Sequence, residues 1–298
     1  MATVSEVWGD EAGSWRTGGK LHWTELAQVQ RRINRRVSGD PDVDPYLHVI
    51  KRYFSLPLDL DRVLTLGCGF GEIERGLVQY GTIGRHDAFD VAPGAIAKAH
   101  SEAAAQALNH VHYEIADLNR AVLERNAYDW VLGVHSVHHI SCLEHLFAEV
   151  RAALKPGGLF ALNEFVGPSQ FQWTDRQLEV VNGLFAVLPA SLRRNRAHSG
   201  TPKPHVTRPT IAEMNRIDPS EAIRSAEILA LLPRYFEILE VRGWGGTVLH
   251  LLLHEIAGNF EEVTGGPAIL DAVCEVEEAL IAAGDLTDDF ALIVCRAR

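Results

Sequence analysis

Apolar and polar positions follow two alternating patterns through the middle of the chain. Short apolar runs of the kind that form strands lie at residues 63–67, 86–91, 110–117, 129–135 and 158–165. Segments with helical periodicity separate them at residues 72–81, 93–109 and 143–158. Pro156 and the two glycines after it end the last of these helical segments. This alternation predicts a parallel sheet that is covered by helices on both faces.

The pattern continues near the end of the chain. Strand-like runs lie at residues 235–244 and 289–298, and helical segments lie at 247–260 and 268–284. With 298 residues, 47% of them hydrophobic, the chain is long enough to bury a sizeable core. The sequence therefore predicts one large α/β domain, or such a domain with a substantial insertion, built on seven strands.

Two regions fall outside the alternation of strand and helix. The predicted boundaries are an N-terminal helical cap at 1–60, a core at 61–166, a helical lid at 167–233 and the completion of the sheet at 234–298. In the cap, an amphipathic helix at 23–37 ends at a turn that begins with Gly39. In the lid, Asp218, Pro219 and Glu221 have the composition of a helix start, with Asp218 as the N-cap and Glu221 reaching back to it.

Charge and cysteine content narrow the class of partner and the compartment. A formal net charge of -11 argues against nucleic acid or an anionic membrane, because those partners are held mainly by Lys and Arg. The four cysteines are far apart and form no CxxC pair, so neither a disulfide framework nor a zinc ribbon is expected. No apolar run is long enough to span a bilayer, and the N-terminus lacks the pattern of a signal peptide. These features favour a soluble cytoplasmic protein.

A glycine loop follows the first predicted strand. Gly67, Gly69 and Gly71 lie between an apolar run and a helical segment, which is the usual arrangement of a loop that binds a nucleotide-like ligand. A dinucleotide fingerprint would require a glycine at position 72, where the chain has Glu72, so binding of a pyrophosphate is disfavoured. A carboxylate at the helix start would tolerate a ligand that carries an ammonium or a sulfonium group.

The run VLTLGCGFGE at 63–72 resembles the first motif of the class I S-adenosylmethionine (SAM)-dependent methyltransferases, and the later runs follow in that family's order. The resemblance implies a Rossmann-like, doubly wound, mostly parallel seven-stranded sheet and SAM as cofactor. It also implies that Asp90 binds the ribose and Asp117 the adenine. The cofactor-binding residues that it implies are Gly67, Cys68, Gly69, Gly71, Asp90, Val91, Asp117, Leu118 and His135. The family often has an acid two residues before Gly67, where this chain has Thr65.

Three histidines and one carboxylate are candidates for the catalytic chemistry. His135, His138 and His139 follow the fourth strand, and Glu164 ends the fifth, so all four are expected at the carboxyl edge of the sheet. Methyl transfer requires alignment and, for a hydroxyl or ammonium acceptor, a base. We expect His139 to be that base or a substrate contact, although neighbouring histidines of a helix cannot both face one cleft. Glu164 is expected to face the same cleft, or else to be a solvated strand end.

A metal site at His135, His138, His139 and Cys142 is an alternative to these roles. Four ligands from one short segment seldom surround an ion without help from elsewhere, so no metal is predicted.

The sequence supports an enzyme that methylates an oxygen or nitrogen of a small molecule such as a sugar, an amino sugar or a secondary metabolite. A carbon acceptor stays open. The alternatives are a SAM-binding regulatory or partner protein without transfer chemistry and, less favoured, an NAD(P)-dependent oxidoreductase. Expected partners are a small-molecule substrate and neither nucleic acid nor membrane, and a homodimer is left open.

Overall fold

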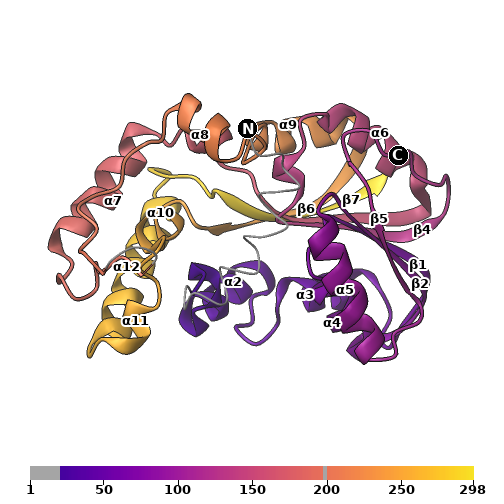
Figure 1. Ribbon diagram of the computed structural model, residues 1–298, viewed down its shortest axis with the longest axis horizontal. Coiled ribbons are helices and arrows are strands. Elements are labelled where there is room, and N and C mark those ends of the chain that lie inside the picture. The colour runs from indigo at the N-terminus through magenta and orange to yellow at the C-terminus, as the bar shows by residue number, and fades with distance from the viewer. Residues whose placement is uncertain (1–20, 197–199) are drawn as a thin grey trace.

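A seven-stranded sheet forms the centre of the molecule (Figure 1). The computed structural model describes residues 21–196 and 200–298. Its strands are β1 (Leu58–Leu66), β2 (Gly81–Asp90), β3 (Val111–Ile115), β4 (Tyr128–Val134), β5 (Leu154–Phe165), β6 (Phe236–Gly245) and β7 (Phe290–Ala297). The order is β3-β2-β1-β4-β5-β7-β6, and β7 runs antiparallel to both of its neighbours. The predicted fold class, a mostly parallel seven-stranded α/β sheet, is confirmed.

Helices cover both faces of this sheet. They are α2 (Ala27–Ser38), α3 (Pro45–Tyr53), α4 (Glu72–Leu77), α5 (Pro93–Ala105), α6 (Leu143–Ala153), α7 (Asp175–Val187), α8 (Ile211–Ile217), α9 (Ile228–Leu231), α10 (Leu249–Leu253), α11 (Asn259–Glu262) and α12 (Gly266–Ala282). Six single-turn 3₁₀ helices are also described: η1 (Trp23–Glu25), η2 (Val78–Tyr80), η3 (Val137–His139), η4 (Ser169–Phe171), η5 (Ser225–Glu227) and η6 (Leu232–Arg234). Helices α6 and α9 lie on one side of the sheet, and α2, α3, α4 and α5 lie on the other (Figure 1).

The strands divide their side chains between these two layers. Val63 of β1 belongs to the apolar cluster that includes α2 and α3, whereas its neighbour Leu64 belongs to the cluster built around α6. Trp130 and Val131 of β4 divide in the same way. Successive side chains of a strand point to opposite faces, so a run that is apolar at every position is buried on both sides. This explains why these strands lack a clean apolar and polar alternation.

The regions predicted as cap and lid each contain helices. In the cap, α2 ends at Gly39 in the left-handed conformation, and Asp44 caps the start of α3 by accepting from the Leu47 N–H. The first twenty residues of the predicted cap, and residues 197–199 of the predicted lid, lie outside the described residues. The division into cap, core and lid stays a prediction.

The structure corrects the helix start that we expected at Asp218. Asp218 instead follows the end of α8, and its Oδ1 accepts from the Ser220 N–H at 2.8 Å and from the Ser220 hydroxyl at 2.6 Å. Ala222 has a φ of 50°, so the chain leaves helical geometry at once. The segment is a series of turns, and Glu221 does not act as a capping residue. Likewise, the single helix expected at 247–260 is divided into α10 and α11, with Glu255 at a φ of 64° between them.

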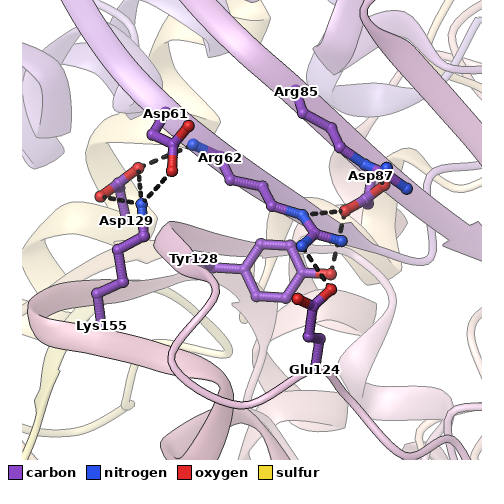
Figure 2. Close-up of polar contacts among 8 residues, drawn as sticks. All are labelled: Asp61, Arg62, Arg85, Asp87, Glu124, Tyr128, Asp129 and Lys155. Carbon is purple, nitrogen blue, oxygen red and sulfur yellow. Dashed lines mark hydrogen bonds and ion pairs between the residues drawn. The ribbon is translucent and has the colours of Figure 1, made fainter.

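A network of charged side chains joins strands β1, β2, β4 and β5 (Figure 2). Arg62 of β1 donates to Asp87 of β2 at 2.7 Å and to Glu124, and its guanidinium lies 4.8 Å from the centre of the Tyr128 ring. Lys155 of β5 donates to Asp61 and Asp129 at 2.7 and 3.0 Å. None of the eight residues drawn in Figure 2 lines the cavity described below, so the network joins the strands without taking part in the site.

Candidate active site

A cavity of about 750 Å³ lies at the carboxyl ends of β1, β2 and β4. Open α/β sheets bind their ligands at this edge. Its wall is formed by the glycine loop, the ends of β2 and β4, and the loops after β3 and α8. The lining residues are Tyr46, Gly67 to Phe70, Glu72, Ile73, Asp90 to Ala92, Ala95, Ala116 to Asn119, Val134 to Ser136, His139 to Ser141, Pro219, Ser220 and Ile223.

The three loop glycines serve two different purposes. All have positive φ, at 69°, 52° and 74° for Gly67, Gly69 and Gly71. A Cβ on Gly67 would lie 2.4 Å from the Ser136 Cβ, and one on Gly71 would lie 2.3 Å from the Tyr113 hydroxyl. A Cβ on Gly69 would meet no atom within 4 Å, although Gly69 lines the cavity. Packing inside the protein therefore requires two of the glycines, whereas Gly69 presents open space to a ligand.

Asp90 joins the end of β2 to the glycine loop. Its Oδ2 accepts from the Gly69 N–H at 2.8 Å, and its Oδ1 accepts from the Ala92 N–H at 2.9 Å. Asp117 lies across the cavity in the loop after β3, where its Oδ1 accepts from Asn119. Both carboxylates are therefore held by local hydrogen bonds while they line the same space.

The other residues expected to bind the cofactor also line the cavity. Cys68, Val91, Leu118 and His135 are all in its wall. Burial raises the pKa of the Cys68 thiol, so it acts here as a small apolar group. His135 follows β4 with a φ of 49°, and its ring contacts Trp244 edge-on with centroids 6.1 Å apart.

His138 and Glu164 form a buried pair behind this wall. Glu164 is fully buried, and it accepts from the Ser136 and Val137 N–H groups at 2.6 and 2.7 Å and from His138 Nδ1 at 2.7 Å. Burial opposes ionisation of Glu164, but His138 outweighs it and lowers the pKa of the carboxyl. Neither residue is among those that line the cavity. The expectation that Glu164 faces the cleft is therefore corrected: its side chain holds the loop after β4.

His139 does line the cavity, and it is bound to the loop after α8. Its Nδ1 lies 3.0 Å from the Ser220 hydroxyl, which donates in turn to Asp218. Burial and then the neighbouring His138 lower the pKa of the His139 ring. The two histidines belong to the 3₁₀ helix η3 rather than to an α-helix, and their rings lie beside each other with centroids 4.3 Å apart.

Sequence reasoning missed three residues of this region. Ser220 lines the cavity, and Glu221 lies beside both histidines, with oxygens 3.6 Å from His138 Nε2 and 3.8 Å from His139 Nε2. In the sequence, these two residues match the pattern of a helix start, which gives no indication of their contacts with the cavity and the histidines. Glu74 of α4 is fully buried, and burial raises the pKa of its carboxyl to about 7. Cys142, the fourth candidate metal ligand, is exposed and precedes the first residue of α6.

The cavity suits a ligand with positive charge. Glu72, Asp90 and Asp117 line it, and its described lining includes no Lys or Arg. A pyrophosphate would meet carboxylates without a compensating cation, whereas a sulfonium or ammonium group would be favoured. With the open space at Gly69, this charge pattern fits SAM better than a dinucleotide.

Comparison with known proteins agrees with this geometry. Residues 63–158 match the sequence model of a family described as a methyltransferase domain. The chain is 28% identical over 159 residues to a ubiquinone biosynthesis O-methyltransferase of Methylobacterium sp. strain 4-46, a match that covers 53% of this chain and 57% of the relative. A protein of the same description from Brucella ovis is 26% identical over 160 residues, covering 53% and 58%. The chain thus spans little more than half the length of these curated relatives.

A solved structure shows the same fold at low identity. Haemonchus contortus phosphoethanolamine N-methyltransferase 2, in complex with phosphomonomethylethanolamine and S-adenosylhomocysteine, is 15% identical with a TM-score of 0.50. That likeness covers 100% of this chain and 60% of the other. In the part of the chain that the structure describes, no helix is long and apolar enough to cross a bilayer.

Proposed function

Residues 63–158 form a class I SAM-dependent methyltransferase domain, and from this premise we propose that the chain transfers a methyl group to an oxygen or nitrogen of a small molecule. The observation that carries the proposal is the acidic cavity beside the glycine loop, with its carboxylates at Asp90 and Asp117. SAM, when bound, supplies a methyl group that is activated by the positive charge on sulfur. The protein's tasks are alignment and exclusion of water.

We assign the cofactor to the part of the cavity between the glycine loop and Asp117. The backbone at Gly69 leaves room for close approach, and the carboxylate of Asp90 is held within reach of the same space by the Gly69 and Ala92 N–H groups. A charged acceptor for two ribose hydroxyls is worth about 1.5–3 kcal/mol per hydrogen bond. Cys68, Val91 and Leu118 would supply apolar contact around the adenine and the sulfur.

The acceptor would occupy the part of the cavity that His135, His139, Ser220 and Ile223 line. Three of these come from η3 or from the predicted lid at 167–233, so we propose that the lid closes the acceptor site. A small acceptor suits a cavity of about 750 Å³, which is within the range of small-molecule sites. The relatives named above include an O-methyltransferase and an N-methyltransferase by description, so both acceptor atoms are retained.

We assign His139 to contact with the acceptor. Its ring lines the cavity, but burial and His138 lower its pKa, so near neutrality it is a weaker base than a free histidine. His138, whose pKa is raised by Glu164 and Glu221 against the opposing effect of burial, lies behind the wall. Catalysis would then rest mainly on alignment, which can supply about 7–11 kcal/mol in favourable cases.

Two measurements test the function. Calorimetry with SAM, S-adenosylhomocysteine and NAD⁺ in parallel should show binding of the first two and none of the third. Turnover of methyl-labelled SAM with a panel of hydroxylated and amine acceptors should then label a small molecule. Binding of NAD⁺ in place of SAM would overturn the proposal, and SAM binding without transfer to any acceptor would favour a regulatory SAM-binding protein.

A further inference from the structure

A buried carboxylate lies behind the glycine loop. Glu74 belongs to α4, the helix that begins after Gly71, and its side chain is 0% exposed. Neither of its carboxylate oxygens accepts a hydrogen bond from any residue that the structure describes. Its Oε1 lies 3.9 Å from His86 Nε2, which lies 2.9 Å from the Thr65 hydroxyl oxygen. An ionised carboxylate is costly in such a place, because the hydrogen bonds that it makes with water are lost and not replaced.

The groups around Glu74 leave its charge without full compensation. Burial lowers the pKa of the His86 ring to about 3, so this ring is neutral near pH 7. Burial raises the pKa of three further neighbours, which are therefore neutral too: Cys68, Tyr46 and Tyr113. The charged neighbours in the described structure are Arg75 of the same helix and Asp90 at the end of β2. Burial outweighs the opposing effects of Thr65 and Arg75, and it raises the pKa of the Glu74 carboxyl to about 7.

The same neighbours connect Glu74 with the cavity. Glu74 is not itself a lining residue. Cys68, Asp90 and Tyr46 line the cavity, and all three lie close enough to the buried carboxyl to interact with it electrostatically. Ile73, the residue before Glu74, is also in the wall. Charges interact strongly across so thin a layer of protein, because the effective dielectric constant there is well below that of water. A cation in the cavity therefore favours the ionised form of Glu74, and by reciprocity the ionised form favours the cation.

We propose that Glu74 selects for the charged cofactor: its carboxylate, behind the glycine loop, favours binding of SAM over S-adenosylhomocysteine and couples SAM binding to the release of a proton. This inference rests on the proposed function, because it requires SAM in the cavity. SAM carries a positive charge on sulfur that S-adenosylhomocysteine lacks, so the carboxylate stabilises bound SAM more than bound product.

The proton balance of this coupling is simple. When SAM binds, the proton leaves the Glu74 carboxyl for solvent, and the carboxylate then compensates the charge on sulfur. After methyl transfer the sulfur is neutral, and the carboxyl takes up a proton from solvent again. The same residue therefore favours exchange of the product for a new molecule of SAM.

The direction of the pH effect follows from this equilibrium. Below pH 7 the Glu74 carboxyl, whose pKa is about 7, is mostly protonated, and SAM has to displace that proton to gain the interaction. Above pH 7 the carboxylate is already present. SAM affinity should therefore rise from pH 6 to pH 8 by about fivefold, at the lower end of typical coupling between two sites.

Glu74→Gln in the whole chain tests the proposal. The variant keeps the shape of the side chain and removes its titration, and we expect it to fold, because a neutral amide is less costly to bury than a carboxylate. The matched control is Glu114→Gln, whose side chain is exposed on β3. Calorimetry with SAM and with S-adenosylhomocysteine at pH 6, 7 and 8 measures the affinities. Repetition at pH 7 in two buffers of different ionisation enthalpy measures the protons released. The ammonium group of the ligand titrates alike with every chain, so the difference between wild type and variant isolates Glu74.

The wild type and Glu114→Gln should release more protons with SAM than with S-adenosylhomocysteine, and Glu74→Gln should lose that difference. At pH 8 the Glu74→Gln chain should bind SAM about fivefold more weakly than the wild type, with a smaller preference for SAM over the product. At pH 6 the two chains should bind SAM alike.

Two results would overturn the role of Glu74. One is a Glu74→Gln chain, folded by circular dichroism, with the pH dependence and the preference for SAM of the wild type. The other is equal proton release by SAM and S-adenosylhomocysteine in the wild type. Either result with SAM binding intact overturns this inference alone, whereas a wild-type chain that binds no SAM at any pH overturns the proposed function as well.

Discussion

Replacing Gly69 by alanine tests whether the glycine loop approaches the cofactor. The added Cβ would meet no protein atom within 4 Å, and the backbone N–H that donates to Asp90 is retained. The folded protein therefore suffers only the cost of an L-residue at a φ of 52°, about 1–2 kcal/mol. A ligand that packs against this backbone loses contact or has to shift, so we expect SAM to bind at least about tenfold more weakly, or about 1.4 kcal/mol.

Two other glycines provide the controls. Gly39, at the end of α2, has a φ of 87° and also has no atom within 4 Å of an added Cβ, so Gly39→Ala carries a similar backbone strain away from the cavity. Gly67→Ala places its Cβ 2.4 Å from the Ser136 Cβ and should destabilise the fold more than either of the others.

Calorimetry with SAM measures the effect of each variant on cofactor affinity. Thermal unfolding measures its effect on the stability of the fold. Gly39→Ala and Gly69→Ala should lower Tm by similar amounts, roughly 2–4 °C for each kcal/mol. Gly69→Ala should weaken SAM binding although it destabilises the fold no more than Gly39→Ala does. Gly39→Ala should leave SAM binding unchanged. Equal SAM affinity in the Gly39 and Gly69 variants would refute the assignment of this loop to the cofactor.

Three further outcomes are expected. Asp90→Asn should weaken SAM binding at least about tenfold by calorimetry, because a neutral amide replaces a charged acceptor. Arg62→Met should destabilise the fold by about 1.5–3 kcal/mol in urea, because the buried Asp87 loses one of its two guanidinium partners and keeps Arg85. Burial raises the pKa of Asp87, but Arg85 and Arg62 outweigh it and lower the pKa, so the contribution of these pairs is present above about pH 4 and lost in more acidic solution. Burial raises the pKa of Glu74 to about 7, so its stabilising protonated form is lost as the pH rises through 7. Glu74→Gln should then gain on the order of 2 kcal/mol relative to the wild type between pH 5.5 and 8 in unfolding experiments.

The sequence was sufficient for those features that depend on neighbours in the chain. The strands of the core are predicted because their side chains are buried on both faces, and the glycine loop because Gly67, Gly69 and Gly71 need positive φ. The antiparallel placement of β7 between β5 and β6 was not predicted, because an apolar run carries neither a direction nor a position in the sheet.

The features that the sequence did not predict depend on residues distant in the chain. Asp218 and Glu221 match a helix start in composition, but Asp218 bonds to Ser220, and Glu221 faces two histidines about 80 residues earlier. Glu164 was expected in the cleft because it ends a strand, yet two backbone N–H groups and His138 hold it behind the wall. A residue that ends a strand can be placed at the carboxyl edge of the sheet from the sequence alone. Its position does not tell which hydrogen-bond donors its carboxylate will meet there.

The same distant contacts change the role assigned to His139. Sequence position alone makes it the candidate base, since it follows β4 at the ligand edge of the sheet. The structure surrounds it with His138, Ser220 and Glu221, of which the first lowers its pKa and the second occupies its Nδ1. A ring whose pKa is lowered in this way is a weak proton acceptor near neutrality, because the proton that it would take up is held less tightly than by a free histidine. The contacts that the sequence could not show therefore favour a role for His139 in contacting the acceptor over a role as its general base.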